Sequence, residues 1–455
     1  MGTAAEELSH FTASLKYEDL SEDVVHKAKQ MLLDTLGCAL GGYLNEPSRI
    51  TRAVLREQGG CPESTIIGSG EKTSCANAAL ANGVMVRYLD FCDIYANLHP
   101  CHPSENIPTA LAMGEREHAT GRDILTAIVI GFEVQQRFAD AVPIHRMGWH
   151  HVSIAGFTTP LVAGKLLNLD ANQLAHAVGI SGSHNLALDG LLGMHGHGQV
   201  TMMKAAGYGF GSQSGIIAAL MAQKGFTGPH TIIESFNDTV FKGTDLTPLI
   251  KGGEKMRILE TSIKPFPCEF MIHSPLEALF TLLREHEIKA EDVVELHLRT
   301  HEFAFNALAQ PRAYKPETRE TADHSLPYCL AIGLIEKDVG IDQFLREQWK
   351  DPEVLKLMSK IKVTVDPELE KLYPRARPAD LEIVTKKGER YRTRVDYPKG
   401  DPRNPMTDKE VRAKFGKLAK PLMSEGQMSR IVEIVNNLEN LNDVGKLMEQ
   451  LVMQG

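Results

Sequence analysis

The sequence predicts a mainly α-helical protein with one large helical part and one smaller α/β part. Up to about residue 265 the pattern is helical and rich in alanine, glycine and leucine. Between there and about residue 400, three segments alternate apolar and polar residues as strands do. A helical pattern then returns. The 455 residues, of which 43% are hydrophobic, are enough to bury a large core in two or more domains.

The first part of the chain predicts a series of helices. The clearest begins at Ser21, has Glu22 and Asp23 in its first turn, and ends at Gly41 and Gly42. Further helices are expected at 75–88, 104–118, 121–139, 154–167, 170–181 and 202–224, with a short one from His230. Their many small residues predict close packing around a central helix.

The later part of the chain mixes strands and helices. Strands are expected at 293–299 and 360–365, and the segment 381–395 reads as a hairpin that turns at Lys387 and Gly388. Helices are expected at 274–286 and 325–335 between them, and at 407–422 and 429–448 after a polar segment. This order predicts a smaller α/β unit followed by a return to helices.

Composition and charge exclude several classes of partner. The chain has 58 acidic and 49 basic residues, so its net charge of -9 argues against nucleic acid or an anionic membrane as a main partner. Glu6 and Glu7 stand where a secretory signal would be basic and then apolar, so we expect a cytoplasmic protein. The 7 cysteines are scattered and form no Cys-x-x-Cys pair, which predicts neither disulfides nor an iron–sulfur cluster.

The segment 88–104 is the most informative for function. It places Asp90, Asp93, His99 and His102 close together, and two prolines stiffen the backbone that carries them. Ser104 can cap a following helix, so the imidazoles would lie near a positive helix N-terminus. The segment therefore predicts a site that holds an anion.

Two further segments carry polar residues among apolar ones. His150 and His151 precede a helix and could present an imidazole at its start, although a single histidine is more often a hydrogen-bonded core or surface residue. Lys204 lies among apolar and small residues. A buried lysine needs a partner, and a bound carboxylate would supply one.

Two segments after residue 260 add candidates. Lys264 lies in a loop fixed by prolines, although a solvated lysine is the ordinary alternative. His324 and Tyr328 are one helical turn apart, so both could point into one cleft. A helix cap by Asp323 or His324 would explain the same pattern.

No familiar cofactor motif accompanies these residues. The glycines at 207–211 lack the last glycine of a dinucleotide fingerprint, and there is neither a Gly-x-Ser-x-Gly elbow nor a P-loop. His99 and His102 with Asp90 or Asp93 could be half a zinc site, but their spacing is not that of common zinc sites. We therefore expect no metal and no cofactor. Acids, bases and cationic anchors suit proton abstraction next to a carboxylate.

Taken together, the motifs resemble one family. They are Asp90-Phe-Cys-Asp93 with His102-Pro-Ser, Gly148-Trp-His150, Lys204, Lys264-Pro-Phe-Pro, Ala322-Asp-His-Ser-Leu-Pro-Tyr328 and Tyr397-Pro-Lys-Gly. This ordered series resembles the MmgE/PrpD family, which includes 2-methylcitrate dehydratase, cis-aconitate decarboxylase and iminodisuccinate epimerase. The resemblance implies a large all-helical domain (1–265 with 403–455) with an inserted smaller α/β lid domain (266–402). It also implies a homodimer and catalysis without metal or cofactor.

The resemblance also implies the site residues and a reaction. Its catalytic positions would be Asp90, His102, His150 and Tyr328. Its substrate-binding positions would be Lys204, Lys264, Asp93, Glu269 and His324. Cys92 stands where a second aspartate is frequent, and Glu269 stands where decarboxylase-like members carry histidine. Glu269 favours a hydro-lyase of the 2-methylcitrate dehydratase type acting on a di- or tricarboxylate.

Other readings of the same residues remain open. They are a cis-aconitate-type decarboxylase, an iminodisuccinate-type epimerase, a metal-dependent hydro-lyase and a catalytically silent carboxylate-binding protein. Since candidates fall in both parts of the chain, we expect the two parts to close on each other, with hinges near 265–275 and 395–405.

Overall fold

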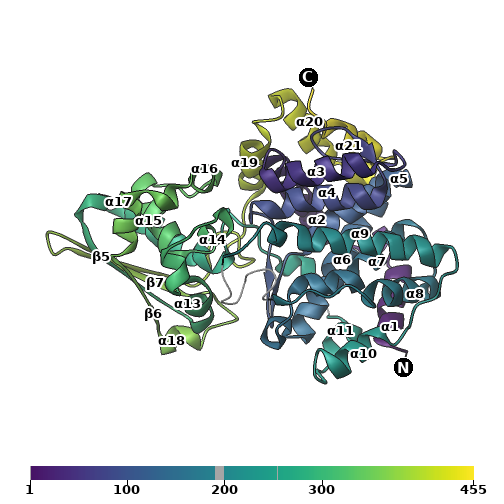
Figure 1. The fold of residues 1–455 in the computed structure, drawn as a ribbon, viewed down its shortest axis with the longest axis horizontal. Coiled ribbons are helices and arrows are strands. Elements are labelled where there is room, and N and C mark those ends of the chain that lie inside the picture. Colours follow the sequence, from purple (N-terminus) through teal and green to yellow (C-terminus); the bar gives the residue numbers. More distant parts are fainter. Residues whose placement is uncertain (1, 190–198, 254, 455) are drawn as a thin grey trace.

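The computed structural model describes residues 2–189, 199–253 and 255–454 and shows two lobes of unequal size (Figure 1). Their buried hydrophobic side chains form two large clusters, one drawn from residues 4–263 and 411–451 and the other from residues 268–383. We call these parts the helical lobe and the α/β lobe. Helices predominate and the sheets are small, which confirms the predicted mainly α class.

The helical lobe carries both ends of the chain (Figure 1). Its helices are α1 (Ala4–Ser14), α2 (Glu22–Gly42), α3 (Glu46–Gln58), α4 (Cys75–Tyr88), α5 (Ile107–Arg116), α6 (Gly121–Ala141), α7 (Ala155–Leu166), α8 (Ala171–Gly182), α9 (Met203–Gln223), α10 (Ile232–Thr239), α11 (Thr247–Lys251), α19 (Asp408–Ala419), α20 (Glu425–Asn436) and α21 (Gly445–Gln450). Short strands β1 (Ser64–Thr65) and β2 (Lys72–Thr73) pair, as do β3 (Tyr95–Ala96) and β4 (Pro100–Cys101). None of the helices in the described ranges is both long and apolar enough to span a bilayer.

Small residues let the central helices approach closely, as the sequence predicts. Helix α9 packs against α4 and α7. A Cβ atom added at Gly83 in α4 would lie 3.2 Å from the Cα atom of Gly209 in α9, so this crossing requires glycine on both helices. The crossing fixes the C-terminal end of α4 beside the N-terminal half of α9.

One helix prediction for this lobe is wrong, and α1, α3 and α11 were not predicted. The expected helix at 429–448 is wrong, because α20 ends at Asn436 and α21 begins at Gly445. Between them Leu438 and Val444 turn into the core, and the Asp443 carboxylate accepts a hydrogen bond from the backbone N–H of Gly445 at 2.8 Å. Helix α1 was not predicted, although Thr3 and Glu6 form a capping box at its start.

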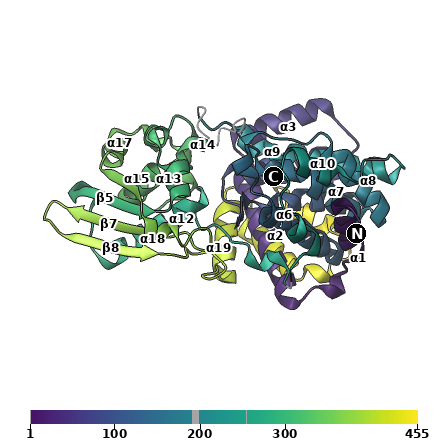
Figure 2. The same cartoon turned by 90° about the horizontal axis from the view of Figure 1, so that it is seen from below.

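The α/β lobe contains a four-stranded sheet in the order β6–β5–β7–β8. Strands β5 (Val293–Thr300) and β6 (Ile361–Val365) are parallel, while β7 (Ala379–Thr385) is antiparallel to β5 and to β8 (Arg390–Val395). The β7–β8 hairpin confirms the predicted turn, in which Gly388 has a φ of 81°. Figure 2 shows α12 and α15 beside this sheet.

The helices of the α/β lobe precede β5, lie between β5 and β6, and lie between β6 and β7. They are α12 (His273–Glu285), α13 (Glu302–Leu308), α14 (Arg319–Ala322), α15 (Leu326–Glu336), α16 (Ile341–Leu345), α17 (Pro352–Met358) and α18 (Pro367–Glu370). Helix α12 contacts β7, β8 and α15. Helix α14 and the N-terminal end of α15 face the helical lobe, which brings the segment 319–326 to the boundary between the lobes.

The two connections between the lobes run side by side. The backbone N–H of Ile263 donates to the carbonyl oxygen of Gly400 at 3.1 Å. Gly400 has a φ of 91°, and a Cβ atom there would lie 1.9 Å from the carbonyl oxygen of Ile263. Only glycine fits this contact. The pairing places the loop that carries Lys264 directly at the boundary.

Candidate active site

The carboxylate of Asp90 lies among buried cations at the boundary between the lobes. Its Oδ1 atom contacts the guanidinium of Arg87 and lies 3.7 Å from Lys204 Nζ, while Oδ2 lies 3.2 Å from Lys264 Nζ. Burial would raise the pKa of Asp90, but Lys204, Lys264 and Arg87 hold it well below its usual range. Asp90 is therefore an ionised carboxylate that forms ion pairs with these three cations.

Lys204 links Asp90 to the α/β lobe. It stands in the first turn of α9, and its Nζ atom lies 3.3 Å from Asp323 Oδ1 and 3.3 Å from His324 Nδ1. Asp323 also accepts from Arg319 at 2.9 Å, and Arg319 in turn donates to the carbonyl oxygen of Tyr88 at 2.8 Å. These contacts cross the boundary, so the cluster is complete only when both lobes meet.

Lys264 is buried, so the alternative of a solvated lysine is excluded. It is 1% exposed, and its Nζ atom donates to the carbonyl oxygens of Asp90 and Cys268, each at 3.1 Å. The ammonium group of Lys264 meets Oδ2 of Asp90, whereas that of Lys204 meets Oδ1. Two ammonium groups therefore face one carboxylate.

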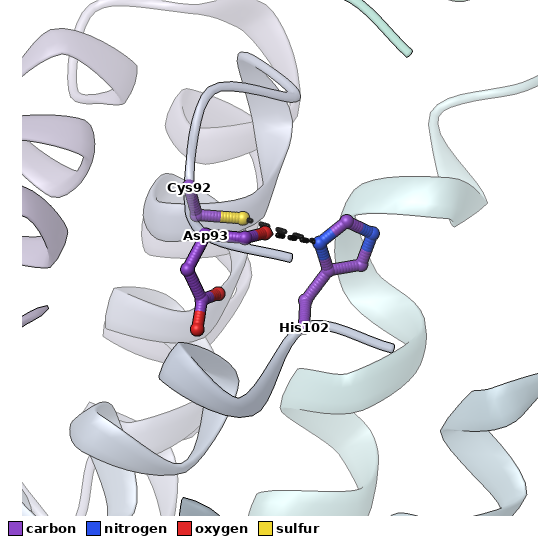
Figure 3. Close-up of side chains that lie close together, drawn as sticks. All are labelled: Cys92, Asp93 and His102. Atoms are coloured by element: carbon purple, nitrogen blue, oxygen red, sulfur yellow. Dashed lines mark hydrogen bonds between the residues drawn. The ribbon is translucent and has the colours of Figure 1, made fainter. Parts of the chain in front are cut away.

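In the imidazole of His102, one nitrogen is hydrogen-bonded and the other is free. Its Nδ1 atom lies 2.6 Å from the carbonyl oxygen of Asp93 and 3.9 Å from Cys92 Sγ (Figure 3). Since a carbonyl only accepts, Nδ1 carries the proton and Nε2 keeps its lone pair. Nε2 makes no hydrogen bond with another described residue. Burial, then Arg87 and Lys264, lowers the pKa of His102 well below its ordinary value, so the ring is a neutral base.

Asp93 supports this loop rather than facing His102. Figure 3 shows its carboxylate directed away from the imidazole. The carboxylate accepts from the backbone N–H of Ser104 at 3.1 Å and from its hydroxyl at 2.5 Å, at the start of the turn Pro103–Asn106. Burial raises the pKa of Asp93 to about 7. The predicted substrate-binding role of Asp93 has no geometric support here.

Further imidazoles extend from His102. The ring of His151 lies 5.3 Å from that of His102, and the ring of His150 lies 4.2 Å from that of His151. The Nε2 atom of His151 is 3.3 Å from Glu105 Oε2, and Glu105 Oε1 is 3.4 Å from Arg87 Nε. His151 is thus the direct neighbour of His102, and the predicted His150 is one ring further away.

Arg87, Glu105 and Arg319 were missed in the sequence. Arg87 precedes Asp90 by three residues and Arg319 precedes Asp323 by four, which are the spacings of side chains that meet on one helix face. This spacing of opposite charges was the sequence signal from which Arg87 and Arg319 could have been found. It is common on solvated helices, so it becomes informative only when the partner carboxylate is known to be buried.

Tyr328 does not join the cluster. Its side chain is fully buried in the α/β lobe, its hydroxyl donates to the carbonyl oxygen of Gln343, and its ring lies against Phe344 and Trp349. The predicted shared face with His324 fails because Ser325 is the N-cap of α15, so His324 stands outside the helix. His324 faces Lys204, whereas Tyr328 faces the core.

Glu269 lies beside the cluster. Its backbone N–H donates to the carbonyl oxygen of Asp323 at 2.9 Å, and its carboxylate accepts from the backbone N–H of Met271 at 2.6 Å. Burial raises the pKa of Glu269 to about 7, although Lys264 opposes this shift. The group can therefore carry a proton at neutral pH and release it.

Among the residues that the structure describes, two groups of side chains have the proximity that a metal ion would need. In the first, Asp90, Asp323 and His324, the neighbouring cations Lys204, Lys264 and Arg319 oppose a further positive charge. In the second, Cys92, Asp93 and His102, burial raises the pKa of the Cys92 thiol to about 12, and His102 Nδ1 already donates to a carbonyl oxygen. The donor set of neither group fits a metal ion.

The charge of Glu105 predicts a pH-dependent stability. Burial raises its pKa to about 8, although Arg87 opposes the shift. Glu105 therefore contributes most to the free energy of unfolding when it is protonated, below the ordinary glutamate pKa. This contribution is lost as the pH rises through about 8. We expect Glu105→Gln to become steadily more stable relative to the unsubstituted protein between about pH 5 and about pH 9 in urea titrations. A difference that stays constant with pH would contradict the raised pKa.

Comparison with known proteins gives consistent matches. A family model described as the MmgE/PrpD N-terminal domain matches residues 6–249, and one described as the MmgE/PrpD C-terminal domain matches residues 266–440. A cis-aconitate decarboxylase-like protein of Aspergillus oryzae is 27% identical over 98% of this chain and 97% of its own length. The cis-aconitate decarboxylase of Homo sapiens is 25% identical over 95% and 91%. The 2-methylcitrate dehydratase of Escherichia coli is 25% identical over 78% and 76%.

Proposed function

Because this chain belongs to the MmgE/PrpD family, we propose that it is a cofactor-independent lyase that acts on a di- or tricarboxylate. The observation that carries the proposal is the buried cluster in which Lys204 and Lys264 face Asp90 beside the neutral imidazole of His102. Removal of a proton next to a carboxylate creates an enediolate, and two fixed ammonium groups would stabilise its charge.

The residues have three roles: one is the base, two bind substrate carboxylates, and one positions the lysines. Nε2 of His102 accepts the proton, since Nδ1 already donates to the Asp93 carbonyl oxygen. Lys204 and Lys264 bind substrate carboxylates as charge-assisted hydrogen-bond donors. Asp90 holds both lysines in place, and His324 donates through Nδ1 to Asp323, the carboxylate that also pairs with Lys204. In the closed arrangement each lysine is already paired, so substrate enters when the lobes separate.

We favour a hydro-lyase of the 2-methylcitrate dehydratase type. Loss of water needs an acid that protonates the departing hydroxyl, and Glu269, with a pKa of about 7, borders the cluster. A cis-aconitate-type decarboxylase is the second candidate, because curated relatives of that name align over almost the whole chain.

Proton NMR of the purified protein with 2-methylcitrate, citrate and cis-aconitate tests the proposal. We expect water loss from a 2-hydroxy tricarboxylate. Release of carbon dioxide from cis-aconitate would replace the hydro-lyase by the decarboxylase, and no conversion of any di- or tricarboxylate would overturn the proposal.

Glu269 offers a prediction that separates the two reactions. We expect Glu269→Gln to lower the rate of water loss by about 10²- to 10⁴-fold, because the amide cannot donate a proton to the departing hydroxyl. The rate is measured as appearance of the alkene by NMR, and Glu302→Gln, at an exposed position in α13, serves as the control. Unchanged water loss in Glu269→Gln would exclude Glu269 as the acid.

Closure of the lobes is a further prediction. The connections near 265–275 and 395–405 contain Pro265, Pro267 and Gly400, so they are the expected hinges. Closure would exclude water and strengthen the electrostatics around an enediolate. We expect tricarballylate, an unreactive tricarboxylate, to slow hydrogen exchange in both connections. Unchanged exchange at saturating ligand in an active preparation would indicate a preformed site.

We also propose that the protein is a homodimer, as the family resemblance implies. Phe210 and Ile217 stand seven residues apart on α9 and are 49% and 47% exposed, so they give one helix face an apolar surface. Light scattering coupled to size-exclusion chromatography measures the mass directly. A monomer at micromolar concentration would contradict this proposal.

A further inference from the structure

A cavity lined by arginines lies at the boundary between the lobes. Its volume is about 470 Å³, which falls in the range of small-ligand sites. Arg375 and Arg377 of the α/β lobe, Arg403 of the second connection and Asn97 of the helical lobe are among the side chains that line it. Asp90, His102, Lys204 and Lys264 are not part of this lining.

The local charge is opposite to that of the whole chain. Arg375, Arg377 and Arg403 are opposed by Glu260, which also lines the cavity, and by the buried Asp401 behind it. Three positive groups and one negative group line the cavity, in a protein whose net charge is -9, and Asp401 pairs with two of these arginines. Asp140, which accepts from Tyr95 and Asn97 in the lining, is paired with Arg257. Such a local excess of arginine attracts anions.

The arginines differ in how far their donors are used. Arg403 uses all three of its nitrogens, because it donates to Asp401 at 2.7 and 2.8 Å and also to the carbonyl oxygen of Arg375. Arg377 is 7% exposed and donates to the carbonyl oxygen of Ala96 at 2.7 Å and to Asp401 at 3.4 Å. Its buried Nε atom has no acceptor among the described residues.

Arg375 is the most available of these groups. Its side chain is exposed and makes no hydrogen bond or ion pair with another residue that the structure describes. The cavity is thus lined by one exposed guanidinium without a partner among the described residues and by a second, buried guanidinium whose donors are only partly used. Ser262 adds a hydroxyl group to the same wall.

We propose that this cavity is a second anion site, separate from the catalytic cluster, that binds a small dianion carrying carboxylate or phosphate groups. A dianion in the cavity can accept from the free fork of Arg375 and from the guanidinium donors that Arg377 and Arg403 leave unused. Because Arg377 also holds the carbonyl oxygen of Ala96 in the helical lobe, the bound anion joins both lobes and stabilises their closed arrangement.

Isothermal titration with inorganic phosphate and, separately, with succinate tests the proposal. Sodium chloride holds the ionic strength constant, so that general screening is matched. The full-length protein is compared with Arg375→Ala and with Arg430→Ala, which removes an exposed arginine from α20. The variant Lys204→Met/Asp323→Asn is included because it disables the catalytic cluster. Arg375 is exposed, so its replacement should leave the fold intact.

We expect saturable binding of at least one probe in the unsubstituted protein and in Arg430→Ala, and binding about 10- to 100-fold weaker in Arg375→Ala. The probe that binds identifies the ligand as a phosphate or a carboxylate. Because succinate can also bind the catalytic lysines of the proposed lyase, Arg375→Ala is also measured in the Lys204→Met/Asp323→Asn background. Binding that survives in this triple variant would place the anion elsewhere and overturn the proposal. Absence of binding by both probes would do the same. The titrations do not measure lyase activity. The binding result can therefore be interpreted even if the protein proves not to be a lyase.

Discussion

Replacement of His102 by alanine is expected to lower kcat by about 10²- to 10⁴-fold while KM changes little. The reason is geometric. Nδ1 donates to the carbonyl oxygen of Asp93, which leaves the lone pair of Nε2 for the substrate proton. Burial, Arg87 and Lys264 keep the ring neutral, so the base is ready at pH 7. Initial rates measured over a range of substrate concentrations separate kcat from KM.

A matched control distinguishes catalysis from packing. His301 is also buried, at 1% exposed, but it lies in the α/β lobe, where it caps α13. We expect His301→Ala to alter stability by about 1 kcal/mol, as loss of a cap does, while kcat stays within a factor of a few. If His102→Ala were folded and turned over substrate at a near-normal rate, His102 would have no part in proton transfer.

Lys204→Met is expected to abolish substrate binding and to destabilise the protein. The sequence alone predicts a higher KM in a protein whose fold is little changed. The structure alters this expectation, because Lys204 neutralises both Asp90 and Asp323 where neither carboxylate meets water. Breaking a buried ion pair from one side costs about 3–5 kcal/mol. Urea unfolding and steady-state kinetics measure the two effects separately.

A double variant separates the two roles of Lys204. In Lys204→Met/Asp323→Asn the charge of Asp323 is removed with that of its partner, so much of the lost stability should return. Substrate binding should not return, because the ammonium group is still missing. Wild-type KM and kcat in Lys204→Met would show that the lysine is structural and that the substrate binds elsewhere.

The sequence predicts those site residues whose local surroundings already indicate that they are buried. Asp90, His102, Lys204 and Lys264 stand among prolines, glycines and apolar residues, where a charged group requires a partner, and the structure brings all of them to one boundary. The helices α4 and α9 were predictable for the same reason, since their small residues leave little choice but close packing.

Other features depend on contacts that a single chain pattern does not contain. Tyr328 was misplaced because one-turn spacing has meaning only inside a helix, and α15 begins after His324. Glu105 and Arg87 look like ordinary helix-surface residues until tertiary packing buries them. The break between α20 and α21 arises because Leu438 and Val444 turn into the core, which outweighs local helix propensity.

A crystal structure of the protein with bound tricarballylate tests the central claim most directly. The account predicts that carboxylate groups of the ligand lie within hydrogen-bond distance of Lys204 Nζ and Lys264 Nζ, with Nε2 of His102 facing a ligand methylene. It also predicts that a ligand at Arg375 and Arg377 would be additional to this one. A ligand found only between these arginines, or a complex in which both lysines remain paired with Asp90 and Asp323 alone, would contradict the assignment of the buried cluster as the active site.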